Sequence, residues 1–453
     1  MKDEVELMKS QQWSSKIGFI LAAAGSAIGL GAIWKFPYMA GSNGGSIFLL
    51  FFILFTVLIA GPILLAEFVI GRRGKSDAIS TYRKLAPSSA WPFVGYLGTV
   101  VAIIILSFYS VAGGWILSYL FRSVTGSLMG LSQEEYGGLF ETIISNPVEV
   151  LLAQAIFMIM TIAVVQTGIQ NGIERASKIM MPALLIMFII LAIRSLTLDG
   201  ASEGLAYLFI PDWSYMTSET MLLALGQSFF ALSVGVSVMV TYASYLKDDE
   251  NLGRSMGSVA ILNIVISLLA GIVIFPAVFA FGFEPGEGPG LVFVVLPAVF
   301  NELAFGGLFM FVFLVLLLFA TLTSAFSILE IVTASLSRGR PEKRKKYAWL
   351  SGILIFIVGL PSALSFGVLT DVTINGLLIF DFADYVANNF GLPLGALLIS
   401  LFVGFRLKKE DVFAELEKGA NGHTKWMHVW YFLIKVLAPL AIIAIFLQSL
   451  EII

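Results

Sequence analysis

Glycines and small polar residues interrupt two long apolar segments at similar places. Residues 25–31 read GSAIGLG, and residues 226–235 read GQSFFALSVG. Such residues disfavour a continuous helix, and a break leaves carbonyl oxygens without partners and creates a new helix N-terminus. Carbonyl oxygens can hold a small cation, and the positive end of a helix dipole suits a carboxylate. The alternative is that these glycines only allow helices to pack closely.

Isolated polar side chains in other apolar segments could supply further oxygen ligands. Thr321, Thr323 and Ser324 lie together in one such segment, and Asn263 lies alone in another. Hydroxyls and carbonyls together make a cation site without formal charge, although a single hydroxyl in a membrane helix more often bonds its own backbone. The carboxylate of Glu67 also lies in an apolar segment, where it is either functional or braces neighbouring helices.

The composition shows what kind of protein must position these residues. Of the 453 residues, 58% are hydrophobic and 13% are charged, against about 45–50% and about 25% in soluble domains. This excess of apolar residues excludes a soluble enzyme and indicates a membrane protein. The chain has no cysteine and only two histidines, so thiolate chemistry is excluded and a histidine metal site is not expected. The net charge of −3 gives no reason to expect a nucleic-acid partner.

The apolar segments predict an all-α polytopic membrane protein. A helix needs about 20 apolar residues to cross the hydrocarbon core. By that measure we predict eleven spans, near residues 17–40, 46–70, 92–121, 148–166, 177–194, 220–245, 258–283, 306–336, 347–368, 374–405 and 427–449. The run Leu291–Phe300 is too short to cross, and we expect a loop that dips back toward the protein. The breaks in spans one and six are five spans apart, as inverted repeats would place them.

Basic residues follow every second span, and the remaining loops carry almost none. The positive-inside rule therefore predicts a cytoplasmic N-terminus and an extracellular C-terminus in a plasma membrane protein. The residues that carry this prediction are Arg72, Arg73, Lys75, Arg83, Lys84, Arg175, Lys178, Lys247, Arg254, Arg338, Arg340, Lys343, Arg344, Lys345, Lys346, Arg406, Lys408 and Lys409.

Several motifs resemble those of the neurotransmitter:sodium symporters. Residues 29–38 (GLGAIWKFPY) with residues 43–45 (NGG) resemble the family's first-helix signature. Residues 226–233 with 241–245 (TYASY), and residues 322–324 (LTS), look like its sixth- and eighth-helix signatures. The resemblance covers about residues 10–449. The chain looks most like the shorter bacterial amino-acid members with eleven spans, and is similar to a bacterial transporter of many hydrophobic amino acids.

The resemblance implies a LeuT-type fold, with sodium flow driving substrate uptake by alternating access. It implies one membrane transporter unit over residues 1–453, with a first inverted repeat at about 13–196, a second at about 218–407 and an extra helix at about 425–449. The implied sodium ligands fall into two sets. One set is Gly25, Ile28, Ala320, Thr323 and Ser324; the other is Ala27, Ala231, Ser233 and Asn263 with the substrate carboxylate. In the second set the sequence departs from the family, because Ala32 replaces a usual Asn and Ala231 replaces a usual Thr or Ser.

The resemblance also implies a substrate pocket. Monoamine members place an Asp at the position of Gly29, so a glycine there implies a substrate that brings its own carboxylate, and therefore an amino acid. The small Val236, where a relative has Phe, implies room for bulky or aromatic side chains. The implied pocket residues are Leu30, Gly31, Ile105, Tyr109, Phe230, Ser233, Val236, Ser324 and Ile328.

Other positions of the family pattern differ in this chain. Lys35 and Asp384 resemble the outer gate pair, with Lys in place of a frequent Arg. The two sets of implied ligands lead us to expect two sodium ions. Phe52 replaces the Tyr usual at the chloride site, so we expect no chloride, although Ser267 stands where chloride-dependent members have Ser. On the inner side Trp13 matches, but Arg338 stands at a position that is often acidic.

Gly172 and Pro182 flank the start of span five, and both disfavour a continuous helix. We hypothesise that this end unwinds to let water reach the sodium ions; equally, Pro182 could only kink a packed helix.

The sequence therefore predicts a sodium-coupled symporter, not an enzyme, that lies in the lipid bilayer and imports hydrophobic L-amino acids, including aromatic ones. The alternative is an amino-acid-gated channel or a non-transporting amino-acid sensor on the same fold. The sequence carries no information on the oligomeric state.

Overall fold

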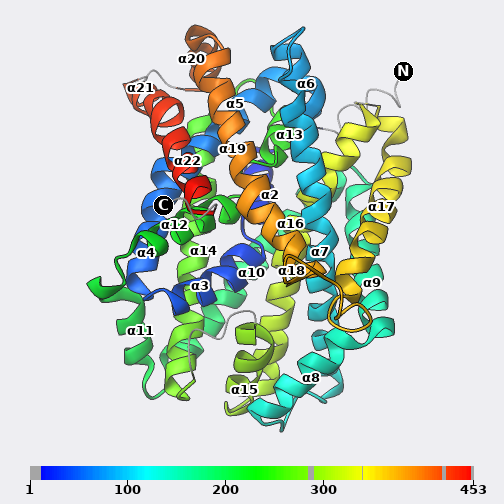
Figure 1. Ribbon diagram of the computed structural model, residues 1–453, viewed down its shortest axis with the longest axis vertical. Helices are drawn as coiled ribbons and strands as arrows, with labels where there is room; N and C mark the ends of the chain where they lie inside the picture. Colours follow the sequence, from blue (N-terminus) through cyan, green and yellow to red (C-terminus); the bar gives the residue numbers. More distant parts are fainter. Residues whose placement is uncertain (1–11, 284–289, 339, 421–424, 450–453) are drawn as a thin grey trace.

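The computed structural model describes residues 12–283, 290–338, 340–420 and 425–449, and nearly all of it is helical (Figure 1). The helices of the first half are α2 (Lys16–Ala27), η1 (Gly31–Lys35), α3 (Phe36–Ser42), α4 (Ser46–Phe55), η2 (Thr56–Ala60), α5 (Gly61–Gly74), α6 (Ala78–Leu85), α7 (Pro92–Thr125), α8 (Gln133–Ser145), α9 (Pro147–Val165), η3 (Ile169–Glu174), α10 (Arg175–Leu196), α11 (Ala201–Phe209) and η4 (Trp213–Tyr215).

The second half continues the same architecture and adds one small hairpin. Its elements are α12 (Ser218–Ala231), α13 (Val238–Ser244), α14 (Leu252–Ala280), η5 (Leu291–Val295), α15 (Leu296–Asn301), α16 (Gly306–Ser337), η6 (Pro341–Lys343), α17 (Arg344–Leu364), β1 (Thr373–Ile374), β2 (Leu377–Leu378), α18 (Ile379–Tyr385), η7 (Val386–Gly391), α19 (Leu392–Leu401), η8 (Phe402–Arg406), α20 (Lys409–Glu417), α21 (Lys425–Phe432), η9 (Leu433–Leu437) and α22 (Ala438–Ser449). The strands β1 and β2 pair antiparallel.

The helices confirm a polytopic membrane protein, but not the predicted count of eleven spans. Within the described residues, nine helices are long and apolar enough to cross a membrane, and the bent pair Lys16–Ala27 and Gly31–Ser42 makes a tenth. The predicted sixth span is divided between α12 and α13, which are separated by a non-helical segment. Neither part is long enough to cross alone, because the glycine-rich sequence ends the helix in the middle of the span.

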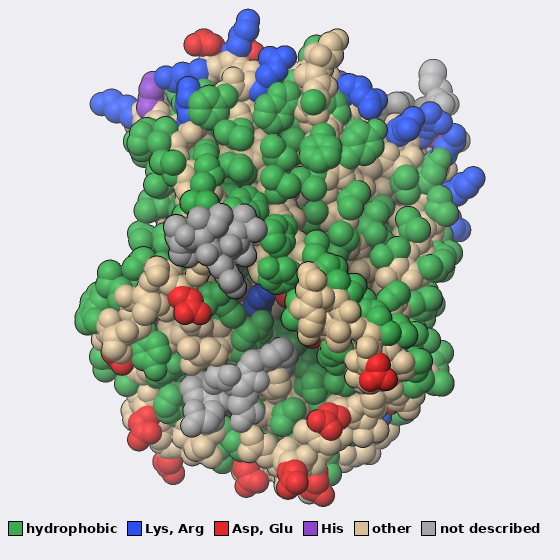
Figure 2. Space-filling view, in the orientation of Figure 1, with side chains coloured by type: hydrophobic (Ala, Val, Ile, Leu, Met, Phe, Trp, Pro, Cys, Tyr) green, Lys and Arg blue, Asp and Glu red, His purple; other side chains and the backbone are tan. Residues whose placement is uncertain are grey.

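The long helices run roughly parallel, and the two ends of the molecule differ in charge. Lys and Arg side chains gather at the end that carries α6 and α20, and Asp and Glu dominate the opposite end near α8, α11 and α15 (Figures 1 and 2). We call these the basic end and the acidic end. Apolar side chains cover the surface between them, as expected for a protein whose sides contact lipid.

The short apolar run after α14 does not cross the membrane, as predicted, but it is helical and not a loop. η5 and α15 together span Leu291–Asn301, and most of their side chains are fully buried. Phe293 stacks on Phe140 of α8 with ring centroids 5.1 Å apart, and its carbonyl accepts a hydrogen bond from Tyr119. A helix satisfies its own backbone groups, which a buried loop could not do.

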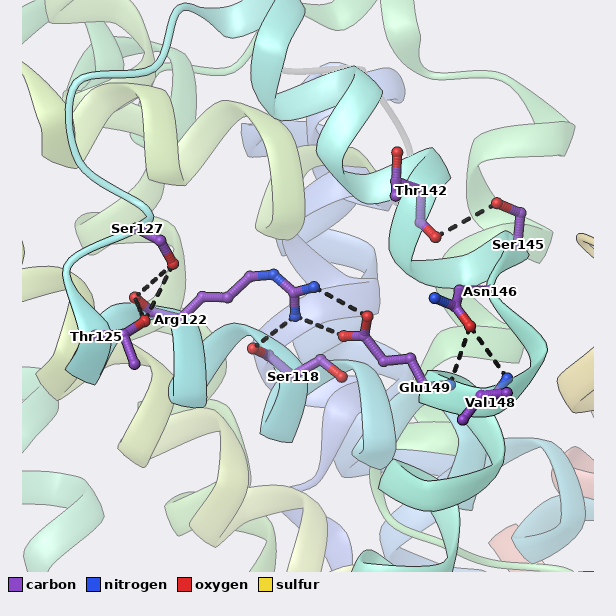
Figure 3. A network of polar contacts seen from close by, with 9 residues as sticks. All are labelled: Ser118, Arg122, Thr125, Ser127, Thr142, Ser145, Asn146, Val148 and Glu149. Atoms are coloured by element: carbon purple, nitrogen blue, oxygen red, sulfur yellow. Dashed lines mark hydrogen bonds and ion pairs between the residues drawn. The ribbon is translucent and has the colours of Figure 1, made fainter.

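Near the acidic end, a bidentate ion pair joins α7 to α9. Arg122 donates to the Glu149 carboxylate at 2.5 and 2.9 Å. Figure 3 shows the two side chains pointing toward each other, with Asn146 accepting hydrogen bonds at the start of α9. Asn146 caps this helix, and Pro147 follows at its first position, where no backbone donor is needed.

Buried ion pairs join helices at the basic end as well. Arg344, at the start of α17, donates to both carboxylate oxygens of Glu330 in α16, and Tyr245 donates to the same carboxylate at 2.8 Å. Arg72 of α5 pairs with Glu415 of α20 at 2.6 Å. Separating the two partners of such a pair would leave a buried charge without compensation, which is costly. These contacts therefore fix the positions of the helices.

The segment that we expect to unwind at the start of the fifth span is helical in this structure. Gly172 lies in the wide π-helical turn η3, and Pro182 lies inside α10, which continues to Leu196.

Candidate functional site

The first helical break separates α2 from η1. α2 ends at Ala27, and the following helical part is bent by 52° relative to it. The last carbonyls of a helix have no partner within it. Gln227 of α12 satisfies one backbone oxygen on the other side of the break, because its amide nitrogen donates to the Gly31 carbonyl at 2.6 Å. The break is therefore braced from the second broken helix.

The second break separates α12 from α13 and contains three residues with positive φ. Ser233, Gly235 and Ser237 have φ values of 52°, 97° and 59°, a conformation that strains side chains other than glycine. The carboxylate of Glu67 from α5 holds this segment, accepting from the backbone N–H groups of Gly235 at 2.8 Å and Met239 at 3.1 Å.

Glu67 thereby closes the N-terminal end of α13. A third backbone N–H, that of Val240, donates to the same carboxylate at 3.3 Å. A buried carboxylate is stable in an apolar span only with such partners. Of the two predicted roles, the geometry gives this side chain the bracing one.

The hydroxyls of α16 meet the backbone of α2 at its C-terminal end. Ser324 donates across the helix interface to the carbonyls of Gly25 at 3.1 Å and Ser26 at 3.0 Å. Thr323 bonds within its own helix, to the carbonyls of Phe319 and Ala320, both at 3.0 Å. A Cβ on Gly25 would lie 3.0 Å from the Cβ of Thr323.

Four of the five residues of the first predicted sodium set are thus in one place: Gly25, Ala320, Thr323 and Ser324. The fifth, Ile28, lies just beyond the end of α2, where carbonyls are released from helical pairing. These neutral oxygens suit a hard monovalent cation. Within the described residues no cluster of His, Cys, Asp or Glu could hold a metal.

The second predicted set also converges, around Asn263 of α14. The Asn263 amide nitrogen donates to the carbonyls of Ala27 at 3.3 Å and Ala231 at 2.8 Å, while its oxygen has no partner. The carbonyls of Ala27 and Ala231 therefore lie next to the Asn263 amide. A cation could bind between them if the amide rotated to place its oxygen, instead of its nitrogen, toward the two carbonyls. Ser233 bonds instead to the Ser26 carbonyl at 2.9 Å, so its hydroxyl lies toward the first set.

A cavity lies between the two breaks. All nine residues predicted for the pocket line it: Leu30, Gly31, Ile105, Tyr109, Phe230, Ser233, Val236, Ser324 and Ile328. About 420 Å³ of space lies between the atoms of these residues, but only about 30 Å³ of it admits a water-sized molecule, so the cavity is tight in this structure. Polar groups lie along α2 and α16, and apolar side chains of α7, α12 and α16 form the rest.

The sequence reasoning missed two apolar lining residues. Val238 begins α13, and Leu392 begins α19. Nothing in the sequence distinguishes Leu392 from the other apolar residues of span ten. A Cβ on Gly235 would overlap its carbonyl, so the glycine at the second break is the only available hint that another helix approaches there.

Gly29 faces the polar side of the cavity and leaves no room for a side chain. A Cβ there would overlap the Ser324 hydroxyl and lie 2.6 Å from the Tyr109 hydroxyl. The Leu30 backbone N–H donates to that Tyr109 hydroxyl at 3.2 Å. Backbone, phenol and serine hydroxyl therefore meet at one point, where their polar atoms could contact a small charged group.

Contacts between helices lie on both sides of the cavity. Toward the acidic end, Lys35 lies 3.6 Å from Asp384, as the sequence reasoning expected, and 4.9 Å from the ring centre of Phe230. A second cavity lined by these residues and by Trp34, Tyr38 and Asp381 lies beyond. Toward the basic end, the buried indole of Trp13 donates to the Tyr242 carbonyl at 2.8 Å.

Comparison with known proteins places this architecture in a family. The family model of the sodium:neurotransmitter symporters matches residues 10–135 and 139–453. The chain belongs to this family, which consists of sodium-dependent membrane transporters and not of enzymes. The resemblance inferred from the motifs is therefore confirmed.

Individual relatives agree with this assignment. The chain is 54% identical over 444 residues to the uncharacterized sodium-dependent transporter YhdH of Bacillus subtilis, covering 98% of both chains. It is 37% identical to an uncharacterized sodium-dependent transporter of Haemophilus influenzae, covering 97% of this chain and 98% of that protein. A crystal structure of MhsT in complex with L-phenylalanine matches with a TM-score of 0.90 and 48% identity, covering 97% of this chain and 99% of that one. The chain therefore has the LeuT-type fold predicted from its motifs.

Proposed function

We propose that this sodium-dependent transporter imports hydrophobic L-amino acids, including aromatic ones, by coupling their entry to sodium. The observation that carries the proposal is the cavity between the two helical breaks, which is polar at one end and apolar at the other. An amino acid has the same division between its charged backbone groups and its side chain. The phenylalanine bound in the similar MhsT structure supports the same substrate class.

The polar end suits the charged groups of the substrate. We infer that the carboxylate meets the Tyr109 hydroxyl and the backbone of Leu30 and Gly31, beside the N-terminal end of η1. The dipole of a helix favours an anion at that end. The ammonium group then lies toward the Ser324 hydroxyl and the carbonyls released at the end of α12.

The apolar end suits a large side chain. Ile105, Phe230, Val236 and Ile328 form it together with Leu392. Each additional buried methylene of a substrate contributes about 0.8 kcal/mol, so leucine, phenylalanine and tryptophan should bind better than alanine.

We propose that two sodium ions enter with the substrate. One would bind among Gly25, Ile28, Ala320, Thr323 and Ser324. The other would bind among the Ala27 and Ala231 carbonyls, the Asn263 amide oxygen and the substrate carboxylate, which links this ion to the substrate. No chloride is needed, and the buried ring of Phe52 against Phe36, with centroids 4.9 Å apart, supports an apolar filling at the position of the family's chloride-site Tyr.

We propose that the basic end faces the cytoplasm, which puts the N-terminus there and the C-terminus outside. The collection of Lys and Arg at one end supports this orientation by the positive-inside rule. The division into inverted repeats at 13–196 and 218–407, with an added helix at 425–449, stays a prediction; the breaks in spans one and six support it.

Contacts on both sides of the cavity that could close over a substrate favour a transporter over the alternatives of a gated channel or a sensor. A channel needs an open path through the molecule in its conducting state, whereas alternating access needs a state in which the substrate is enclosed. The pair of Lys35 with Asp384 and the bond of Trp13 to Tyr242 lie on the two sides of the cavity.

Uptake of radiolabelled tryptophan and leucine into proteoliposomes tests the proposal. With an inward sodium gradient, both should accumulate above their equilibrium level, and with potassium on both sides they should not. Accumulation that ignores sodium would contradict symport. Sodium-dependent binding without accumulation would identify a sensor, and substrate-gated ion currents without accumulation would identify a channel.

A further inference from the structure

A separate cavity lies at the basic end and shares no lining residue with the candidate substrate site. It opens between α6 and α7 on one side and the connection from α16 to α17 on the other. Three arginines line it, Arg83 from α6 and Arg338 and Arg340 from the connection, against a single acidic residue, Asp77. The lining therefore carries an excess of positive charge, although the transporter site is uncharged.

These three arginines have no acidic partner among the described residues, whereas four other arginines do. In the part of the chain that the structure describes, Arg72, Arg73, Arg122 and Arg344 each form an ion pair. No ion pair joins Arg83, Arg338 or Arg340 to any described residue, and all three side chains are exposed. Their guanidinium groups are therefore free to bind an anion.

The connection presents its arginines in a defined position. Arg338 has φ of 48° and ends α16, with its N–H donating to the Ala334 carbonyl at 3.0 Å. The N–H of Arg340 donates to the Ser337 carbonyl at 3.1 Å. These bonds hold the backbone, and guanidinium groups that line two sides of a cavity can donate bidentate hydrogen bonds to the oxygens of a phosphate.

Asp77 adds a second requirement for the ligand. Its side chain is only 7% exposed, and its Oδ1 atom accepts from the Ser80 N–H at 3.0 Å and so caps α6. Its Oδ2 atom is buried without a hydrogen-bond partner. An unsatisfied buried carboxylate oxygen is costly, so a ligand that fits here brings a hydroxyl donor next to its phosphate.

The cavity borders the lipid-facing surface. Tyr96 of α7 lines it and is 49% exposed; Phe93 and Val100, which lie on the same face of this helix, are 59% and 52% exposed. Acyl chains can lie along this apolar face while a head group enters the cavity.

We propose that this cavity binds a phosphate ester that carries a hydroxyl group, and that the ester is the head group of an anionic glycerophospholipid such as phosphatidylglycerol. The phosphate contacts Arg83, Arg338 and Arg340, and the glycerol hydroxyl donates to Asp77. A lipid bound in this way connects α6 to the end of α16. The proposal does not depend on the identity of the transported substrate.

Native mass spectrometry of the full-length protein, released from nanodiscs of phosphatidylcholine with a minor fraction of phosphatidylglycerol, tests this site. The intact protein should retain phosphatidylglycerol preferentially. The double variant Arg338→Gln/Arg340→Gln should retain it about tenfold less, because each lost guanidinium removes a charge-assisted hydrogen bond. The matched control Lys345→Gln/Lys346→Gln removes two exposed charges of the same basic segment outside the cavity and should retain the lipid as the native protein does.

Asp77→Asn and a soluble ligand refine the test. Asparagine still caps α6 but presents no second carboxylate oxygen, so the preference for phosphatidylglycerol over phosphatidic acid should disappear. Glycerol phosphate at millimolar concentration should displace the lipid if free esters share the site. Binding of glycerol phosphate to a protein that retains no lipid would instead assign the site to free phosphate esters and overturn the lipid proposal.

Two further results would overturn the proposal: equal retention by the native protein and the arginine variant, or an equal loss in the lysine control, which would mean that surface charge alone attracts the lipid. Sodium-dependent substrate binding by every variant checks that each one is folded.

Discussion

Glu174 accepts two hydrogen bonds from Ser14, one from its backbone N–H at 2.7 Å and one from its hydroxyl at 2.5 Å. The Ser15 hydroxyl donates to the same carboxylate at 3.1 Å, and Lys178 lies 2.6 Å from it. Gly18 permits this approach, because a Cβ there would overlap the Glu174 side chain. The start of α2 is therefore tied to η3 at the basic end.

Replacing Glu174 by Gln should loosen this end of the transporter. The amide cannot accept from all of these donors or pair with Lys178, so the closed arrangement loses about 1–3 kcal/mol. The chain has no cysteine, so a single cysteine placed at the buried Ala22 can report water access. We expect this cysteine to react with a maleimide at least several-fold faster in Glu174→Gln. Glu149→Gln, at the acidic end, should leave the rate unchanged, and equal rates in all three proteins would contradict the prediction.

Removing the hydroxyls of Thr323 and Ser324 together should abolish sodium-dependent uptake. Each oxygen that contacts a charged group contributes about 1.5–3 kcal/mol, so the double alanine variant should need at least about a hundredfold more sodium for half-maximal substrate binding. Thr333→Ala, on the same helix but bonded to Ser351, is the control and should bind sodium normally. Unchanged sodium dependence in the double variant would mean that the ion binds elsewhere.

Substitutions at Gly29 should separate steric from electrostatic effects. Gly29→Ala places a methyl group against the Ser324 and Tyr109 hydroxyls and should weaken tryptophan binding. Gly29→Asp also adds an anion next to the substrate carboxylate and should weaken tryptophan binding further than Gly29→Ala does. This additional loss of affinity should become smaller at low pH, because protonation removes the charge of the aspartate. Equilibrium binding of labelled tryptophan measures both, and equal affinity in the native protein and Gly29→Asp would contradict the proposed position of the carboxylate.

The contact between Lys35 and Asp384 should slow substrate release only modestly. Lys35 Nζ and Asp384 Oδ2 are 3.6 Å apart, and the two side chains are 21% and 37% exposed. Partly exposed ion pairs contribute about 0.2–1 kcal/mol to stability. Lys35→Met should therefore speed dissociation of bound substrate by up to about fivefold, measured by dilution of preloaded protein. Lys35→Arg can bond Asp384 in a bidentate manner and should slow it. A change of a hundredfold or more in Lys35→Met would show that this lysine contacts the substrate itself.

Much of the fold could be predicted from the sequence because a membrane span is a local property. About 20 consecutive apolar residues identify a span without knowledge of its neighbours, and the glycines of residues 25–31 and 226–235 mark the breaks. The helical form of Leu291–Asn301 depends on contacts with other helices. Those contacts are not visible in a single segment.

The candidate pocket followed from the motifs, whereas its supporting contacts did not. Gly29 and Ser324 carry chemistry that a sequence displays directly. Leu392 looks like any other leucine of an apolar span, and the orientation of the Asn263 amide follows from the carbonyls that happen to face it. The sequence showed the three arginines that line the cavity with Asp77 as markers of orientation, and Arg338 also as a departure from a position that is often acidic. Their lack of acidic partners was not predictable, because pairing is a property of the folded molecule.

Glu67 and Trp13 together define which parts of the protein can move independently. Glu67 holds the start of α13 from α5, and Trp13, just before α2, donates to the carbonyl of Tyr242 within α13. These three elements share buried hydrogen bonds, each of which would cost about 1–3 kcal/mol to break without a replacement. A motion that opens the basic end therefore has to carry them as one body. Its hinges then lie in the two non-helical breaks, where we propose that the substrate and the ions bind, so the ligands would lie on the axis of the motion and respond to it directly.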